Sequence, residues 1–141
     1  MILLAALAIS SATSVPIDAA ARAGLPRATA TLAVHGTQQR CEGVWLADLL
    51  ARAGVPAGDA VKGDALASVV IAEAADGYRV VFSLGEIDRK LGKAPVLVAD
   101  HCAGNPLAAA DGPLRLVVPG DARGARSVRQ LVRVHVQIVS P

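Results

Sequence analysis

The chain has 141 residues, 53% of them apolar, and a formal net charge of +2. This length suits one domain with a sizeable core, and so small a charge does not by itself indicate a polyanionic partner. With one Phe, one Tyr and one Trp, the sequence also lacks the aromatic platforms on which single-stranded nucleic acids stack. We therefore expect no nucleic-acid partner.

An unbroken apolar run occupies residues 1–9 and is followed by small and hydroxyl-bearing residues. A bilayer span takes about 20 residues, so this run predicts no stable membrane insertion. It is typical of a secretory signal, with Ala12 and Ser14 at a small-residue cleavage site; a buried N-terminal helix is the alternative. We expect residues 1–14 to be a signal peptide, residues 15–141 to form the domain, and the protein to be periplasmic or secreted.

The two cysteines, Cys41 and Cys102, fit two different states. An oxidising compartment permits a disulfide between them, whereas two free, mostly buried thiols are the alternative. The sequence does not say whether their Cα atoms lie within bonding distance, so both states stay open. Together with His35, His101 and His135, these cysteines show no spacing typical of a metal site.

The predicted elements are short and mixed. Apolar alternation, β-rich runs and turn residues predict strands, which in chain order cover residues 28–35, 68–74, 78–82, 95–99, 114–118 and 132–138. Residues 17–24 predict a helical turn or two, and residues 45–53 carry an amphipathic helical pattern. Ser83 and Glu86 form a capping box that opens another short helix, which Gly92 can close. The pattern predicts an α+β domain.

Turn residues mark the connections between these elements. Asp76-Gly77 predicts a two-residue hairpin turn, because both residue types tolerate positive φ. Turns are also expected at Asn105-Pro106 and Pro119-Gly120. Residues 55–66 predict a loop.

In this order the pieces resemble the molybdopterin-binding domain of the sulfite oxidase family, especially its small, exported, stand-alone members. The family's GVxLxDLL helix, DGY hairpin, GxPL turn and GPLRLVVPG strand match residues 43–50, 76–78, 104–107 and 112–120. The resemblance covers roughly residues 16–139. It implies a sulfite oxidase-type molybdopterin-binding fold of mixed short strands with a few short helices.

In the catalytic members that the chain resembles, a cysteine thiolate at the end of an early strand ligates molybdenum, a soft-ligand role. The matching strand here ends at residues 32–37 without a cysteine. Cys41 lies just before the helix motif. Cys102 begins a Cys-Ala-Gly-Asn tetrad that looks like the family's cysteine motif but occupies the GxPL turn. The resemblance therefore implies no metal-ligating cysteine, and we assign no catalytic or metal-binding residue.

The C-terminal end of the chain is basic, with five arginines after residue 112 and Asp121 as the one acid. In the catalytic relatives, the segment matching residues 120–129 helps to hold the phosphate end of the pterin. Arg123, Arg126 and Arg129 are therefore candidate cofactor-binding residues, and glycines with arginine forks suit an anion. The alternative is that these arginines pair with acids or carbonyls at the surface.

The function implied is an accessory or an anion- or pterin-binding module without catalytic activity. A molybdenum-dependent oxidoreductase or redox subunit completed by another chain is one alternative, and a purely structural domain is the other. Full enzymes of the family are longer, so we expect that this chain is not an enzyme by itself. We also expect no bound cofactor; molybdopterin is the cofactor that the resemblance allows. A small anionic ligand and a periplasmic partner protein are the expected partners. Trp45 and Tyr78 are interpreted as core or rim packing.

Overall fold

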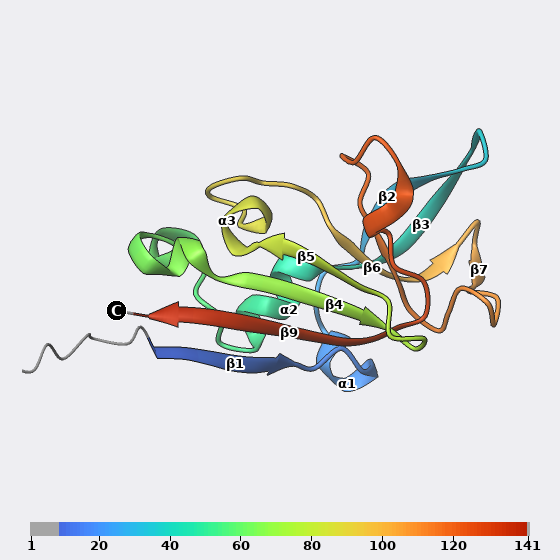
Figure 1. Cartoon of the computed structure of the whole chain (residues 1–141). Helices are drawn as coiled ribbons and strands as arrows, with labels where there is room; N and C mark the ends of the chain where they lie inside the picture. Colours follow the sequence, from blue (N-terminus) through green and yellow to red (C-terminus); the bar gives the residue numbers. More distant parts are fainter. Residues whose placement is uncertain (1–8, 141) are drawn as a thin grey trace, which may run out of the picture.

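A computed structural model describes residues 9–140 as two antiparallel sheets with a few short helices (Figure 1). The first sheet, in the order β1-β9-β4-β5, consists of β1 (Ile9–Val15), β9 (Leu131–Ser140), β4 (Val69–Ala74) and β5 (Arg79–Ser83). The second, in the order β2-β3-β6-β7 with β8 also on β6, consists of β2 (Ala28–Val34), β3 (Thr37–Trp45), β6 (Leu97–Cys102), β7 (Asn105–Pro106) and β8 (Arg115–Val117). The mixed α+β architecture is thus confirmed at this coarse level.

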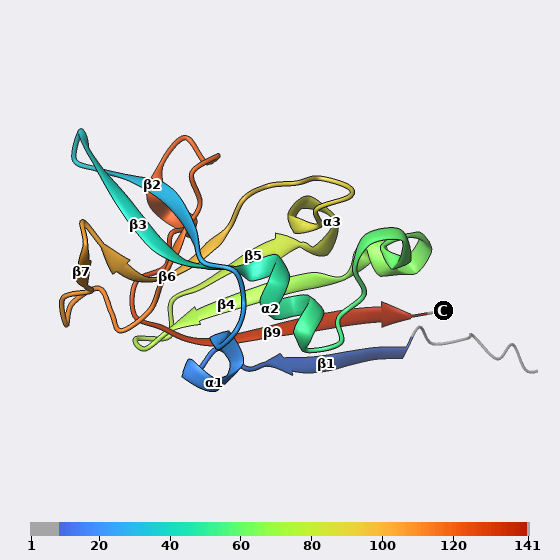
Figure 2. The ribbon, with the colours of Figure 1, turned by 180° about the vertical axis from the view of Figure 1, so that it is seen from behind.

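The helices are short and lie on the loops between strands. They are α1 (Ala19–Arg22), α2 (Leu46–Arg52) and α3 (Leu84–Ile87), with 3-10 turns η1 (Gly58–Ala60), η2 (Gly63–Ala67) and η3 (Gly124–Arg126). Helix α2 covers one face of the first sheet, behind it in Figure 1 and in front of it in Figure 2. No helix within residues 9–140 has the length and hydropathy needed to span a membrane.

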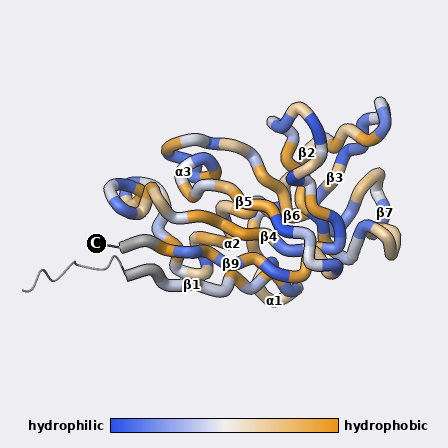
Figure 3. Tube along the Cα trace, in the orientation of Figure 1, coloured by the Kyte–Doolittle hydropathy of each residue, from blue (hydrophilic) through white to orange (hydrophobic). Residues whose placement is uncertain are grey.

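The main core fills the space between the first sheet and α2. Its largest buried side chains include Phe82 of β5, Leu46 and Leu49 of α2, and Val134 of β9. Hydrophobic stretches along β4, β5 and β9 mark this layer in Figure 3. A second, smaller cluster lies on the other face of the second sheet, around Leu97. Aliphatic side chains build both clusters, as the scarcity of aromatic residues requires.

Several predicted elements are confirmed. The strand expected over residues 28–35 is β2, the helix over residues 45–53 is α2, and the hairpin around Asp76-Gly77 is β4–β5. The capping box is also present. The Ser83 hydroxyl accepts from the Glu86 N–H at 3.1 Å, and the Glu86 carboxylate accepts from the Ser83 N–H at 2.9 Å.

Two expectations about local structure need correction. Asn105-Pro106 is not a turn but β7, which pairs with His101 and Cys102; the turn is Ala103-Gly104, whose φ values are +52° and +78°. The loop expected over residues 55–66 contains η1 and the start of η2. In both places the sequence carries turn residues, but their position within the turn depends on the strand register.

Part of the predicted signal peptide forms a strand in the structure. Residues 1–8 of the predicted signal peptide lie outside the described residues. Residues 9–14 belong to β1, which pairs with β9 from Ile9 opposite Ser140 to Val15 opposite Val134. The proposed cleavage site after Ser14 therefore falls within a paired edge strand.

Gly43, the first residue of the GVxLxDLL motif, is required by a close backbone approach. It lies in β3, not in a helix, at a register shift between β3 and β6. A Cβ atom there would lie 1.8 Å from the Val98 carbonyl oxygen. Only glycine lets β3 reach β6 here. Helix α2 begins three residues later, where the Leu46 N–H donates to the Val96 carbonyl at 2.9 Å.

The capping box predicts the effect of one substitution. Ser83→Ala should lower the free energy of unfolding by about 1 kcal/mol, because the Glu86 N–H loses its side-chain acceptor. Urea denaturation of the variant and the wild type measures this difference. An unchanged midpoint and slope would contradict a stabilising cap at α3.

Candidate anion-binding site

The loop at residues 120–129 is closed at its base by hydrogen bonds between β8 and the segment after η3. The Val118 N–H donates to the Ser127 hydroxyl at 3.1 Å, and the Leu116 N–H donates to the Val128 carbonyl at 2.8 Å. Ser127 and Val128 are buried. The loop therefore leaves the sheet and returns to it at one point, and η3 lies directly before the return.

Arg126 lies inside this loop framework. Its guanidinium donates to both carboxylate oxygens of Asp121 at 2.8 and 2.9 Å and to Glu86 at 3.1 Å. It also donates to the Val81 carbonyl at 3.3 Å and lies 4.5 Å from the centre of the Phe82 ring. The bidentate hydrogen bonds raise the pKa of Arg126 and lower that of Asp121. These contacts tie the loop to β5 and α3.

Arg129 lines a hollow of about 330 Å³ between the loop and the β4–β5 turn. Arg115 lies at its base and is buried, with its guanidinium donating to the Ser127 carbonyl at 3.0 Å. Asp111 pairs with both arginines, at 3.9 Å from Arg115 and 3.8 Å from Arg129, and the Asp76 side chain also lines the hollow. Burial lowers the pKa of Arg115 from its usual value. Two cations therefore share one acid at distances too long for direct hydrogen bonds.

The Tyr78 side chain forms part of the wall of this same hollow. Its hydroxyl donates to the Ala125 carbonyl at 2.6 Å, and the side chain is about half exposed. This contact joins the β4–β5 turn to η3. The interpretation of Tyr78 as a rim residue agrees with this position.

Arg123 lies on the opposite side of the loop, in a hollow of about 210 Å³ against β2 and β3. Its side chain makes no ion pair with any residue that the structure describes. The hollow is bounded by residues 31–33 of β2 and by Asp121. The structure thus places Arg123, Arg126 and Arg129 in three surroundings: two separate hollows and the framework between them.

Within residues 9–140 the side chains do not provide a soft ligand for molybdenum. Cys41 of β3 and Cys102 of β6 are opposite each other and form a disulfide. Neither sulfur is then a thiolate, the form that binds metal. Within residues 9–140, no group of three or more His, Cys, Asp or Glu side chains could hold a metal ion. The sequence left the pairing of the cysteines open, and the structure joins them.

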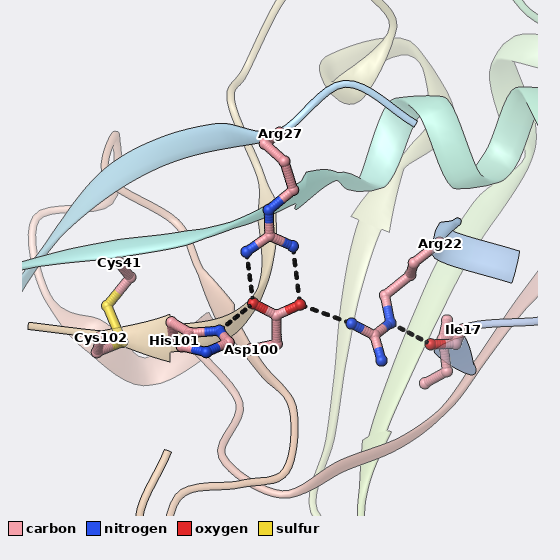
Figure 4. A network of polar contacts seen from close by, with 7 residues as sticks. All are labelled: Ile17, Arg22, Arg27, Cys41, Asp100, His101 and Cys102. Carbon is pink, nitrogen blue, oxygen red and sulfur yellow. Dashed lines mark hydrogen bonds and ion pairs between the residues drawn. A yellow bond between two sulfur atoms is a disulfide. The ribbon is translucent and has the colours of Figure 1, made fainter. Parts of the chain in front are cut away.

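A second polar cluster, which sequence reasoning missed, surrounds Asp100 of β6 (Figure 4). Arg27 binds both of its carboxylate oxygens, at 2.7 and 2.8 Å, and Arg22 of α1 binds one at 2.7 Å. The His101 ring lies at 2.8 Å. The hydrogen bonds from Arg27, with smaller effects of His101 and Arg22, hold the pKa of Asp100 well below its usual range.

The Asp100 cluster fixes where the β2–β3 hairpin leaves the domain. Arg22 also donates to the Ile17 carbonyl at 3.0 Å, so the segment before α1 is included. The contacts span more than 70 residues of sequence, which is why no local pattern revealed them.

Arg126 and Arg123 make a matched pair for testing the loop framework. Arg126→Ala should lower the free energy of unfolding by about 2 kcal/mol, because Asp121 and Glu86 lose charge-assisted donors. Arg123→Ala should change it by less than about 0.5 kcal/mol. Chemical denaturation measures both values, and equal losses in the two variants would refute the framework role of Arg126.

The lowered pKa of Asp100 predicts a pH dependence. Its ion pairs stabilise the fold above the unfolded pKa of about 3.9, and this contribution is lost as the pH falls toward the lower folded pKa. Asp100→Asn should cost about 2 kcal/mol at pH 7, and the difference from the wild type should shrink below about pH 4. Urea denaturation across this range measures it, with Asp64→Asn, at an exposed site, as the control. A difference independent of pH would contradict the assignment.

The family model described as the oxidoreductase molybdopterin binding domain matches residues 13–139 of the chain. No curated protein matches the sequence significantly. The match includes all of β2 to β8 and nearly all of β9. The chain therefore belongs to the oxidoreductase molybdopterin-binding domain family.

Proposed function

We propose that this protein is an exported, non-catalytic binding module of its family that takes a small anion in the hollow of Arg115 and Arg129. The observation that carries the proposal is the geometry of these two guanidinium groups. Arg115 is buried, Arg129 is largely exposed, and both line the same hollow. Asp111 is the acid paired with both at long distance, and Asp76 is the carboxylate among the lining residues. An anion entering there would gain donors that the protein itself does not fully use.

The surroundings of the hollow suit a phosphate-sized group. Gly124 and Ala125 of η3 line it, so backbone as well as side-chain groups border the space. Of the three arginines expected from sequence, Arg129 keeps the binding role in this proposal. Arg126 becomes part of the framework, and Arg115 takes its place at the anion.

The absence of a thiolate supports a role without catalysis. The family membership implies a sulfite oxidase-type fold, in which the metal cysteine would lie at the end of β2, where this chain has Val34. The two cysteines that it does have are bonded to each other. Soft metals select thiolate or thioether ligands, so residues 9–140 do not fit molybdenum, whereas the arginines do fit an anion.

A second candidate function is a redox subunit completed by another chain. It is favoured by the Arg123 hollow, which lies between β2 and the loop that the resemblance associates with the pterin phosphate. Its volume of about 210 Å³ is below the range of about 300–1,000 Å³ typical of ligand sites. A pterin cofactor too large for this hollow would therefore need further contacts from a partner chain. Stoichiometric molybdenum in protein purified from its native host would support this candidate over our proposal.

Export remains a prediction from the apolar residues 1–9. The Cys41–Cys102 disulfide supports it, because such bonds persist in oxidising compartments and are rare in the cytosol. Cleavage after Ser14 would remove most of β1, whose residues pair with β9. The mass of the mature protein from its host would locate the cleavage site.

Calorimetric titration with inorganic phosphate at low ionic strength tests the binding function. Arg129→Gln should weaken binding about tenfold, because one charge-assisted hydrogen bond is worth about 1.5–3 kcal/mol. Asp111→Asn should strengthen it, because the competing carboxylate is removed. Arg133→Gln is the matched control, since Arg133 is similarly exposed and has its own distant acid, Glu73, at 3.9 Å.

The possible outcomes of this titration distinguish the proposed anion site from the alternatives. Loss in Arg129→Gln together with gain in Asp111→Asn supports the proposed hollow. Equal weakening by Arg133→Gln would show unspecific attraction to the basic end of the chain and refute the site. No binding by the wild type at millimolar phosphate would favour a purely structural domain.

A further inference from the structure

We propose that a third hollow, beside Trp45, binds a small single-ring aromatic carboxylate. This hollow has a volume of about 230 Å³ and lies where the end of β3, the start of α2 and the segment after α3 meet. It shares no residue with the Arg115 hollow. The two sites can therefore be tested independently.

The floor and walls of the hollow are apolar. The Trp45 side chain is partly exposed, Ile87 is buried, and Ala47 and Pro95 complete the lining that a ring would contact. A dry cavity of about 150 Å³ holds benzene, so this space suits one ring with a short substituent. The partly exposed indole offers a flat surface for offset stacking.

Two cations stand at the rim of the hollow. Arg89 has one acid partner, Asp48, at 3.2 Å, and its side chain is more than half exposed. Lys93 makes no ion pair within residues 9–140. None of the side chains that line the hollow among these residues is a carboxylate. An apolar floor with a cationic rim is complementary to an amphipathic anion rather than to a neutral ring or a bare phosphate.

Hydrogen bonds hold the backbone of the segment that carries Lys93. Lys93 has a φ of +59°, and its N–H donates to the Asp88 carbonyl at 2.8 Å. The neighbouring Gly92 N–H donates to the Gly85 carbonyl at 2.9 Å, and a Cβ at Gly92 would lie 2.5 Å from Glu86. This tight packing of the segment against α3 fixes the rim, which reduces the entropy lost on binding.

The single tryptophan of the chain reports directly on this site, because Trp45 is the one Trp present. Titration with phenylacetate should produce a saturable change in fluorescence with a dissociation constant of about 1 mM or below, as suits so small a ligand. Phenylacetamide keeps the ring without the charge, and acetate keeps the charge without the ring. Both should bind at least about tenfold more weakly than phenylacetate.

Two variants test the two halves of the site. Lys93→Asn removes the charge while tolerating positive φ, and it should weaken phenylacetate binding about tenfold. Ala47→Leu keeps a good helix former and fills the hollow, so it should abolish binding. Lys62→Asn, at an exposed lysine outside the lining, is the control and should leave binding unchanged. Thermal melts confirm that each variant is folded.

Three results would overturn the proposal. They are the absence of a saturable response to phenylacetate, equal binding of phenylacetamide or acetate, and equal loss in Lys93→Asn and Lys62→Asn. Inorganic phosphate should leave the Trp45 emission unchanged, because its proposed site lies elsewhere. A failure of the phosphate titration therefore leaves this proposal standing, and the reverse also holds.

Discussion

The bidentate ion pair between Arg126 and Asp121 is the contact on which the arrangement of the basic loop depends. One guanidinium joins the loop to Glu86 of the α3 cap, to the Val81 carbonyl of the edge strand β5 and to the Phe82 ring in the core. Because planar Arg–carboxylate pairs fix orientation as well as distance, the loop has one position. The two hollows on either side of it follow from that position.

A second set of contacts holds the base of the β2–β3 hairpin. Arg22 and Arg27 bring the segment before β2 onto Asp100, and the Cys41–Cys102 disulfide joins β3 to β6 beside it (Figure 4). The disulfide closes a separation of 61 residues, which in the chain-entropy model is worth about 4 kcal/mol. The β2–β3 hairpin is thus held by both ionic and covalent links where it leaves the domain.

Local patterns predicted much of the fold, and long-range contacts account for the rest. The Ser83 capping box, the Asp76-Gly77 hairpin and the α2 helix each depend on neighbouring residues, so the sequence alone reveals them. Strand β3 escaped prediction because its first half is polar and its partners lie far away in sequence. Strand β1 was missed because an apolar start looks like a signal whether or not part of it pairs in a sheet.

In the candidate site, too, the sequence predicted the local pattern but not the contacts that depend on the fold. The arginine-rich loop was visible in sequence, but the convergence expected of its three arginines depends on backbone geometry. Arg123 is extended at φ −147° before η3, and Ser127 leaves the helical region at ψ 67° after it. The three-residue spacing of these arginines therefore does not place them on one face of a helix, and the three side chains diverge. Arg115 was missed as a site residue because it lies in an apolar strand and reads as part of the core.

The position of Asp111 explains how Arg115 and Arg129 can lie near each other without a bound ligand. One carboxylate at 3.8 and 3.9 Å screens two cations without forming a hydrogen bond to either. The Arg129 side chain is largely exposed, so its long pair with Asp111 contributes little stability and is replaced at little cost when a better acceptor arrives. Arg115 itself is held by the carbonyls of Ser127 and Leu116, not by the acid. Its guanidinium therefore stays in place whichever anion neutralises it, which is the property required of a preorganised anion site.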